Sequence, residues 1–175
     1  MFKNTLRLLA VVSLFASMSL SAAEVVGKGV VTWVVDGDTY WIKPYSSADF
    51  RGITKDARSS NMRVTEGTFK TRLLNVDTEE SVHRDKSRNT PFGKETSNVM
   101  KSRLYQQEVT FYCDGVGNYG RPLCRVETVQ GDVGLFLIAN GYSKYVTYFG
   151  RSKALDSEYV HAEMSARRSK LGIWR

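Results

Sequence analysis

Residues 25–42 read VVGKGVVTWVVDGDTYWI, two runs of β-forming residues separated by Asp-Gly-Asp at 36–38. Asp-Gly between two such runs is the strongest short-range signal for a β-hairpin. The turn requires the first aspartate and the glycine, but it does not explain the second carboxylate, Asp38. An EF-hand is excluded, because a calcium loop that began at the first aspartate would have Trp41 where glycine is needed and Ser47 where glutamate is needed.

The remaining elements are predicted by hydrophobic patterns of period two and period 3.6. β-Forming runs predict three further strands, at 69–76, 108–112 and 123–129. Apolar residues at helical spacing predict three helices, at 95–105, 133–139 and 152–169. Asp132 is the expected N-cap of the second helix. The polar residues 43–68 are expected to form a long connection, with a short strand near 61–65.

The order of these elements predicts the fold class. Three strands, a helix, two strands and two helices follow one another along the chain. Five short strands with a helix after the third are typical of a small OB-fold barrel, so we expect an α+β, mainly β, five-stranded OB-fold barrel with three helices. Such barrels bind nucleic acids or oligosaccharides, but the fold alone does not determine a function.

Residues 1–23 have the layout of a secretory signal peptide. Two basic residues are followed by an apolar run over 8–20 and by the small residues Ser-Ala-Ala. The apolar run is shorter than the ~20 residues that a membrane-spanning helix needs. We therefore expect cleavage after Ala23 and a single mature domain over residues 24–175. The protein is expected to be exported, periplasmic or extracellular, and without a membrane anchor after cleavage.

The charge balance is basic. The whole chain has 25 Lys and Arg against 18 Asp and Glu. Removing the leader takes away Lys3 and Arg7 and no acidic residue, which leaves 23 basic against 18 acidic residues, a net charge of +5. Such a balance suits a polyanionic partner such as a nucleic acid. Nothing in the sequence indicates an oligomer, so a monomer is expected.

A second stretch, residues 72–80, reads RLLNVDTEE and runs from an apolar strand into carboxylates. Rigid scaffolds commonly present functional groups at such a strand end. Together with Asp38 of the hairpin, Asp77 and Glu80 offer hard oxygen ligands. Oxygen ligands without a His or Cys cluster select calcium, magnesium or manganese rather than zinc.

Two arginines complement these carboxylates. Arg72 and Arg121 carry forked guanidinium groups that bind phosphate oxygens in pairs. A metal ion held by two carboxylates, a third carboxylate that directs water and two arginines on a phosphate are what phosphodiester hydrolysis requires. Taken singly, each residue is more often part of a surface salt bridge. The alternative function is a non-catalytic OB-fold module that binds nucleic acid through the same basic surface.

Over essentially the whole mature chain, the sequence resembles the staphylococcal nuclease (thermonuclease) family. The resemblance is carried by motifs in matching order and spacing: VDGDT at 35–39, RLLNVDT at 72–78 followed by Glu80, NYGR at 118–121 and KLGIW at 170–174. It implies an OB barrel with three helices. It also implies a Ca²⁺-dependent endonuclease that hydrolyses phosphodiester bonds of DNA and RNA to 3′-phosphate products.

The family motifs also imply a calcium site. By this resemblance, Asp38 and Asp77 would bind Ca²⁺ through their side chains and Thr78 through its backbone carbonyl. Asp36 would lie behind these ligands without binding the metal itself.

The resemblance assigns the catalytic groups in the same way. Glu80 would be the base that directs water, and Arg72 and Arg121 would clamp the scissile phosphate. Tyr119 would lie beside the nucleotide, and Tyr148 would meet a terminal phosphate.

The sequence departs from the family pattern at three places. Glu79 stands where the family often has proline, which predicts a looser and more negative loop before Glu80. The connection over 43–68 is longer than in compact members of the family. The tyrosine expected to contact a terminal phosphate is shifted by one residue to Tyr148.

Cys113 and Cys124 flank the loop that carries Arg121, on strands expected to pair as a hairpin. In an oxidising compartment, two cysteines placed in this way are expected to form a disulfide. The bond would restrict the Arg121 loop. The alternative is a pair of buried free thiols.

Overall fold

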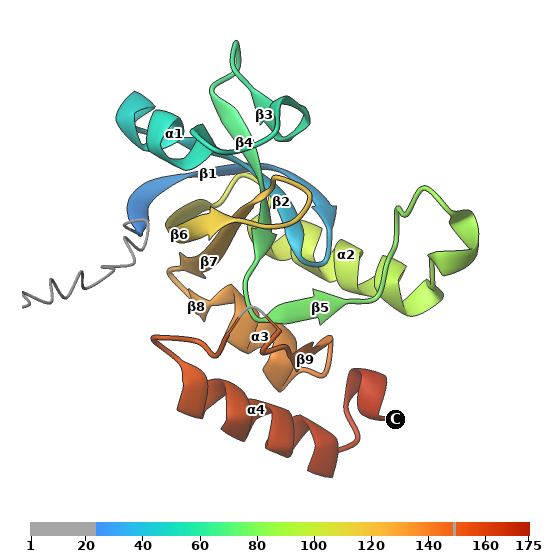
Figure 1. The fold of residues 1–175 in the computed structure, drawn as a ribbon. Helices are drawn as coiled ribbons and strands as arrows, with labels where there is room; N and C mark the ends of the chain where they lie inside the picture. The colour runs from blue at the N-terminus through green and yellow to red at the C-terminus, as the bar shows by residue number, and fades with distance from the viewer. Residues whose placement is uncertain (1–23, 149) are drawn as a thin grey trace, which may run out of the picture.

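The computed structural model describes residues 24–148 and 150–175, so the predicted signal peptide at 1–23 lies outside the described residues. Five long strands form the barrel seen at the centre of Figure 1: β1 (Val25–Asp36), β2 (Thr39–Pro44), β4 (Thr68–Leu73), β6 (Glu108–Val116) and β7 (Pro122–Thr128). They are hydrogen-bonded in the order β4-β2-β1-β6-β7, and a pairing of β4 with β7 closes the barrel. The expected five-stranded OB-fold barrel is confirmed.

Short strands complete the sheets. The two-residue strands β3 (Met62–Arg63) and β8 (Gly131–Asp132) pair at the two edges, with β4 and β7 respectively. A separate two-stranded sheet joins β5 (Val76–Thr78) to β9 (Ser143–Tyr145). The short strand expected near 61–65 is present as β3.

The described residues contain four α-helices rather than the three expected: α1 (Ser47–Thr54), α2 (Pro91–Leu104), α3 (Val133–Ala139) and α4 (Asp156–Arg168). Three 3₁₀ turns lie at η1 (Ser59–Asn61), η2 (Lys86–Arg88) and η3 (Gly172–Trp174). In Figure 1, α2 lies against the barrel, and α3 and α4 lie below it.

The additional helix, α1, lies within the connection expected to be irregular. Its sequence, SADFRGIT, contains glycine and β-branched residues, which are poor helix formers, and it has no long apolar stripe. The helix forms because Ser46 caps it, accepting hydrogen bonds from the backbone N–H groups of Ala48 (3.1 Å) and Asp49 (3.3 Å). Phe50 and Ile53 then pack against the barrel core. Tertiary packing therefore outweighs the weak local preference.

The second helix begins earlier than predicted, at Pro91 rather than at residue 95. Thr90 is its N-cap and accepts a hydrogen bond from the N–H of Gly93 at 2.8 Å. Proline is favoured at the first helical position, where a backbone donor is not needed. The predicted start at residue 95 therefore misses the first turn of the helix, which Pro91 begins. Asp132 caps α3 as expected, accepting from Leu135 N at 2.7 Å.

The barrel interior and the inner faces of α2, α3 and α4 form one apolar core. It is built from side chains that alternate along the strands with outward-facing ones, together with the inner faces of the helices. Its largest fully buried members are Tyr40, Tyr159, Phe69, Phe111, Ile42, Met100, Leu104, Leu137 and Ile138. None of the helices in the described part of the chain has the length and apolar character that a membrane crossing requires.

Cys113 and Cys124 lie directly opposite each other on β6 and β7 and form the expected disulfide. Both residues are buried in the core. The bond closes the hairpin that carries Arg121, with a sequence separation of 11. In the chain-entropy model, a loop of this length gives a stabilisation of about 3 kcal/mol.

We predict that the double variant Cys113→Ala/Cys124→Ala loses about 3 kcal/mol of unfolding free energy, because its denatured chain is no longer cross-linked. Urea denaturation of the variant and the wild type without reductant measures the difference. Addition of reductant should destabilise the wild type and leave the variant unchanged. Two free thiols in denatured, unreduced wild-type protein would contradict the disulfide.

Candidate active site

Strand pairing brings the three polar motifs to one end of the barrel. Thr39, just after the Asp-Gly-Asp turn, pairs with Arg72 on β4, and Arg72 pairs with Leu123 on β7. Leu123 follows closely on Arg121. Segments far apart in sequence therefore meet because β4 lies between β2 and β7.

Asp36 is a buried carboxylate at the end of β1, with four hydrogen-bond donors around it. Its Oδ1 accepts from Gly37 N (2.9 Å), Ser81 Oγ (2.8 Å) and Ser97 Oγ (2.8 Å), and its Oδ2 accepts from Ser81 N (3.2 Å). These bonds tie the hairpin turn to the loop after β5 and to α2. Asp36 thus organises the surroundings of the site, and its oxygens are already engaged.

Asp38 connects the hairpin turn to β5. Its Oδ2 accepts from the backbone N–H (2.9 Å) and the hydroxyl (3.1 Å) of Thr78, and its Oδ1 accepts from the hydroxyl of Thr39 at 3.0 Å. The same Oδ2 forms an ion pair with Nη1 of Arg72. Asp38 is 6% exposed, so these partners strongly determine the orientation of its carboxylate.

Arg72 lies between two of the predicted metal ligands. Its Nη1 is paired with Asp38, although without an aligned hydrogen bond, and its Nη2 donates to Oδ1 of Asp77. Burial lowers the pKa of Arg72, and the negative charges of Asp77 and Glu80 oppose that shift. The Asp77 side chain is 67% exposed, whereas that of Arg72 is 17% exposed. The two carboxylates therefore converge on one cation at the edge of the solvent.

Glu80 is half-buried on the loop after β5, where its charge acts on both arginines. Burial lowers the pKa of Arg121, and the charge of Glu80 is the largest influence in the opposite direction. The backbone carbonyl of Glu80 accepts from Thr90 N at 2.9 Å. At Gly93, an added Cβ would lie 2.4 Å from that carbonyl oxygen. The start of α2 thus holds the backbone of Glu80 by a contact that only glycine allows.

Arg121 reaches the same region from the β6–β7 loop. Its Nη1 donates to the hydroxyl of Thr39 at 3.2 Å, so Thr39 contacts both Asp38 and Arg121. Its Cζ lies 5.8 Å from the ring centroid of Tyr119, which is 72% exposed. Gly120, between them, has a φ of +66°, a conformation that favours glycine.

The connection over 43–68 contacts the Arg121 loop directly. The side-chain amide of Asn61 donates to the carbonyl of Tyr119 at 3.0 Å, and the backbone N–H of Arg58 donates to the carbonyl of Gly120 at 3.0 Å. Asn61 is 4% exposed. The sequence did not identify Asn61, Ser81 or Ser97 as part of the site, because a single amide or hydroxyl has no spacing pattern to mark it.

Tyr148 lies in the segment after β9 and is 80% exposed. Asn75, in the turn between β4 and β5, holds this segment through hydrogen bonds to the carbonyls of Val146 (3.0 Å) and Gly150 (2.8 Å). Its own φ is +63°. The turn that follows β4 thus supports the tyrosine-bearing segment.

The donor set suits a hard cation. The carboxylates of Asp38 and Asp77 lie close enough together to contact the same guanidinium, that of Arg72. Carboxylate oxygens are the ligands that hard cations prefer. The described residues contain no group of three or more His, Cys, Asp and Glu side chains that could hold a metal. Calcium takes six to eight oxygens, so two carboxylates and a backbone carbonyl would leave several positions for water or phosphate oxygens.

Comparison with known proteins identifies relatives of the chain. A family model described as staphylococcal nuclease homologue matches residues 70–175. Endonuclease YhcR of Bacillus subtilis (strain 168) is 30% identical over 164 residues, which are 87% of this chain but only 12% of that protein. Micrococcal nuclease of Shigella flexneri is 27% identical over 139 residues, 73% of this chain and 75% of that protein.

Proposed function

Because this chain belongs to the family of staphylococcal nuclease homologues, we propose that it is a nuclease that hydrolyses phosphodiester bonds in DNA and RNA. The observation that carries the proposal is the convergence of Asp38 and Asp77 on Arg72, beside Arg121 and Glu80. Phosphodiester hydrolysis needs compensation of the charge on the phosphate oxygens and a group that directs water. This cluster contains both.

The two arginines are proposed to bind the scissile phosphate. Arg72 is positioned by Asp38 and Asp77, and Arg121 by Thr39. Both side chains are partly buried, which strengthens their interaction with an anion compared with a solvated pair. Glu80 is proposed to orient and deprotonate the attacking water, because its charge lies close to both arginines.

Asp38, Asp77 and the backbone carbonyl of Thr78 are proposed to hold Ca²⁺. A bound metal ion would polarise the phosphoryl group and compensate its charge. Asp36 bonds Gly37, Ser81 and Ser97 rather than Arg72, and is proposed to keep the hairpin turn in place without binding the metal.

The direct test is digestion of single-stranded DNA and of RNA by the purified mature protein, with calcium and with a calcium chelator. We expect cleavage only with calcium, with products that carry 3′-phosphates and free 5′-hydroxyls. Polynucleotide kinase would label such ends without prior phosphatase treatment. Binding of DNA without cleavage under any divalent cation would favour the alternative, a non-catalytic binding module.

We also propose that residues 1–23 are a signal peptide and that the mature protein, residues 24–175, is exported and monomeric. The disulfide supports export, because disulfides persist in oxidising compartments. An intact mass that begins at Glu24 in the exported fraction is the expected result. A mass that begins at Met1 would contradict it.

Asn61 is predicted to act on catalysis through the Arg121 loop. Asn61→Ala removes the hydrogen bond to the Tyr119 carbonyl, so we expect kcat to fall by about 10-fold or more, since small displacements of a positioning group can cost up to 10²-fold. Steady-state kinetics on single-stranded DNA measures this. Asn140→Ala is the matched control, because its amide also bonds a backbone carbonyl, of Phe136 at 2.8 Å.

A double-mutant cycle separates positioning from a general structural role. In an Arg121→Ala background, Asn61→Ala should have little further effect on kcat, because both changes remove the same interaction with the phosphate. If the losses in kcat of the two single variants were additive in the double variant, Asn61 would not act through Arg121.

A further inference from the structure

The outer face of the barrel beside the candidate active site carries aromatic and basic side chains in register. Trp33 on β1 pairs with Trp41 on β2, and Trp41 pairs with Lys70 on β4. Residues directly opposite on neighbouring strands share one face of a sheet. The intervening residues Tyr40 and Ile42 point into the core, so this row lies on the opposite face of the sheet, where Trp33 is exposed and Trp41 is covered by its neighbours (7% exposed).

The row runs into the active-site cluster. Lys70 and Arg72 lie two residues apart on β4 and therefore on the same face, about 7 Å apart along the strand. Besides burial, the positive charge of Arg121 also acts on Lys70 and lowers its pKa. The row is thus continuous with the two proposed phosphate-binding arginines.

Two cations cover Trp41. The Cζ of Arg63, on β3, lies 4.2 Å from the ring centroid, and the Nζ of Lys70 lies 5.5 Å from it. Burial, followed by the charges of Arg121 and Arg63, lowers the pKa of Lys70. Arg63 pairs with Glu66 on its own turn, where both side chains are at least half exposed.

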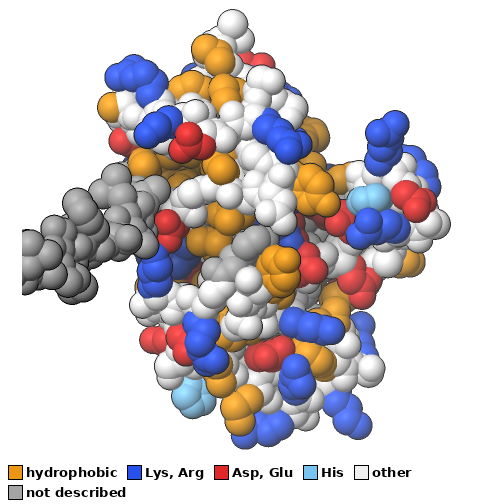
Figure 2. All heavy atoms as spheres, viewed as in Figure 1, with side chains coloured by type: hydrophobic (Ala, Val, Ile, Leu, Met, Phe, Trp, Pro, Cys, Tyr) orange, Lys and Arg blue, Asp and Glu red, His pale blue; other side chains and the backbone are white. Residues whose placement is uncertain are grey.

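The positive charge of Lys70 is poorly compensated, since the charges that act on it are those of Arg121 and Arg63. Within the described parts of the chain, no carboxylate forms an ion pair with Lys70 or with Arg121. The ion pair between Arg63 and Glu66 is exposed, and such pairs contribute little stabilisation. Figure 2 shows Lys and Arg side chains over α1 and β3 at this end of the molecule. Such a surface attracts a polyanion.

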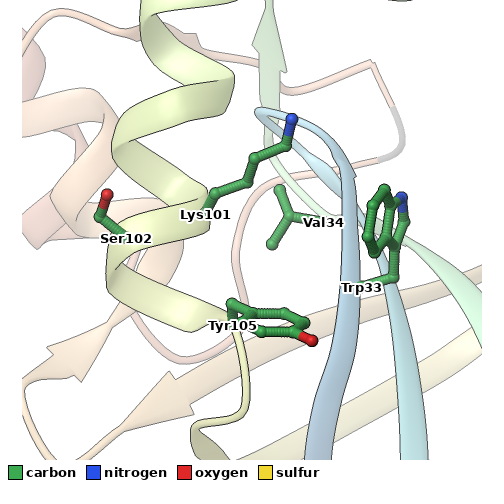
Figure 3. A pocket seen from close by; sticks show the side chains of 5 residues that line it. All are labelled: Trp33, Val34, Lys101, Ser102 and Tyr105. Carbon is green, nitrogen blue, oxygen red and sulfur yellow. The ribbon is translucent and has the colours of Figure 1, made fainter.

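Trp33 adds an aromatic surface at the far end of the row. Its side chain is 55% exposed. Trp33 also lines a pocket with Lys101 and Ser102 of α2, and in Figure 3 its indole lies on the other side of β1 from these two side chains. An exposed indole beside a row of cations is the combination that binds single-stranded nucleic acids, because bases stack on the ring while cations follow the backbone.

We propose that Trp33, Trp41, Arg63 and Lys70 form a subsite for single-stranded polynucleotide next to the scissile phosphate. Arg63 and Lys70 bind backbone phosphates beyond the one that is cleaved, Trp41 supports both cations, and Trp33 stacks with a base. This subsite rests on the proposed function, since it extends the substrate path from Arg72 and Arg121. Arg63 belongs to the long connection, which therefore contributes to substrate binding.

The test is fluorescence anisotropy with a 5′-fluorescein-labelled dT12 oligonucleotide in chelator, where cleavage does not interfere. For Arg63→Ala/Lys70→Ala, we expect weaker binding and a smaller slope of log K against log salt, by about 1.4, since each phosphate contact on a single strand contributes about 0.7. Trp33→Ala should weaken binding about 10-fold at every salt concentration, because stacking is not ionic.

Two control variants make the result specific. Lys28→Ala/Arg168→Ala removes the same charge from exposed positions on β1 and α4 and should leave the slope unchanged. Arg63→Lys/Lys70→Arg keeps both charges and should retain most of the slope of log K against log salt. Loss of packing around Trp41 alone would weaken binding without changing that slope.

The outcomes separate the subsite from the proposed function. If the wild type cleaves DNA but the alanine variants bind dT12 with the same slope and affinity as the control, the subsite is wrong and the nuclease assignment stands. If the wild type binds dT12 with the expected salt dependence but does not cleave it with any divalent cation, the nuclease assignment is wrong.

Discussion

Replacing Glu80 with glutamine is expected to abolish cleavage of single-stranded DNA while the fold stays intact. Glutamine keeps the shape of the side chain but cannot accept the proton of the attacking water. Removing a positioned general base typically costs 10²–10⁴-fold in rate. We therefore expect the rate constant for cleavage with calcium to fall by about 10³-fold, measured under single-turnover conditions so that product release does not mask the chemical step.

Glu79 provides the matched control. It is adjacent and exposed, and its carboxylate accepts a hydrogen bond from the hydroxyl of Thr90, the N-cap of α2. Glu79→Gln keeps that hydrogen bond and should change kcat by less than about 3-fold, within the range of a minor electrostatic effect. If Glu79→Gln were the more damaging change, the base would be misassigned by one residue.

Much of the fold was predictable because its signals are local. The hairpin around Asp36-Gly37 has a strong turn signal, and the register it sets places Asp36 opposite Thr39. The pairing of Cys113 with Cys124 followed from their positions on two strands joined by a loop. In each of these cases, a short pattern determines a contact between neighbouring strands.

The missed features depend on contacts that local patterns do not encode. Helix α1 forms through its cap and the burial of Phe50 and Ile53, although its sequence has weak helix preference. Similarly, Asn61 became part of the site through a hydrogen bond to a carbonyl 58 residues away. The serines around Asp36 come from two separate segments. Only the assembled barrel shows such contacts.

Asp38→Asn is expected to remove most calcium binding and, with it, cleavage. The buried Asp38 carboxylate faces Arg72 and accepts two hydrogen bonds from Thr78. Asparagine keeps one acceptor oxygen for Thr78 but removes the negative charge that a hard cation requires. We expect the calcium dissociation constant, measured by calorimetry, to rise by more than 10²-fold. The free energy of unfolding should fall by about 1–3 kcal/mol, because a hydrogen-bonded charge at a buried site is lost.

The corresponding change at Asp36 distinguishes a metal ligand from a residue that organises the turn. Asp36 accepts four hydrogen bonds from Gly37, Ser81 and Ser97, so Asp36→Asn should lower stability to a similar extent. Its effect on calcium affinity should be much smaller, since the hydrogen-bond partners of Asp36 are Gly37, Ser81 and Ser97, whereas Asp38 faces Arg72 beside Asp77. Equal losses of calcium affinity in the two variants would show that the calcium site depends on the whole turn rather than on direct binding by Asp38. A large loss confined to Asp38→Asn would support Asp38 as a direct ligand.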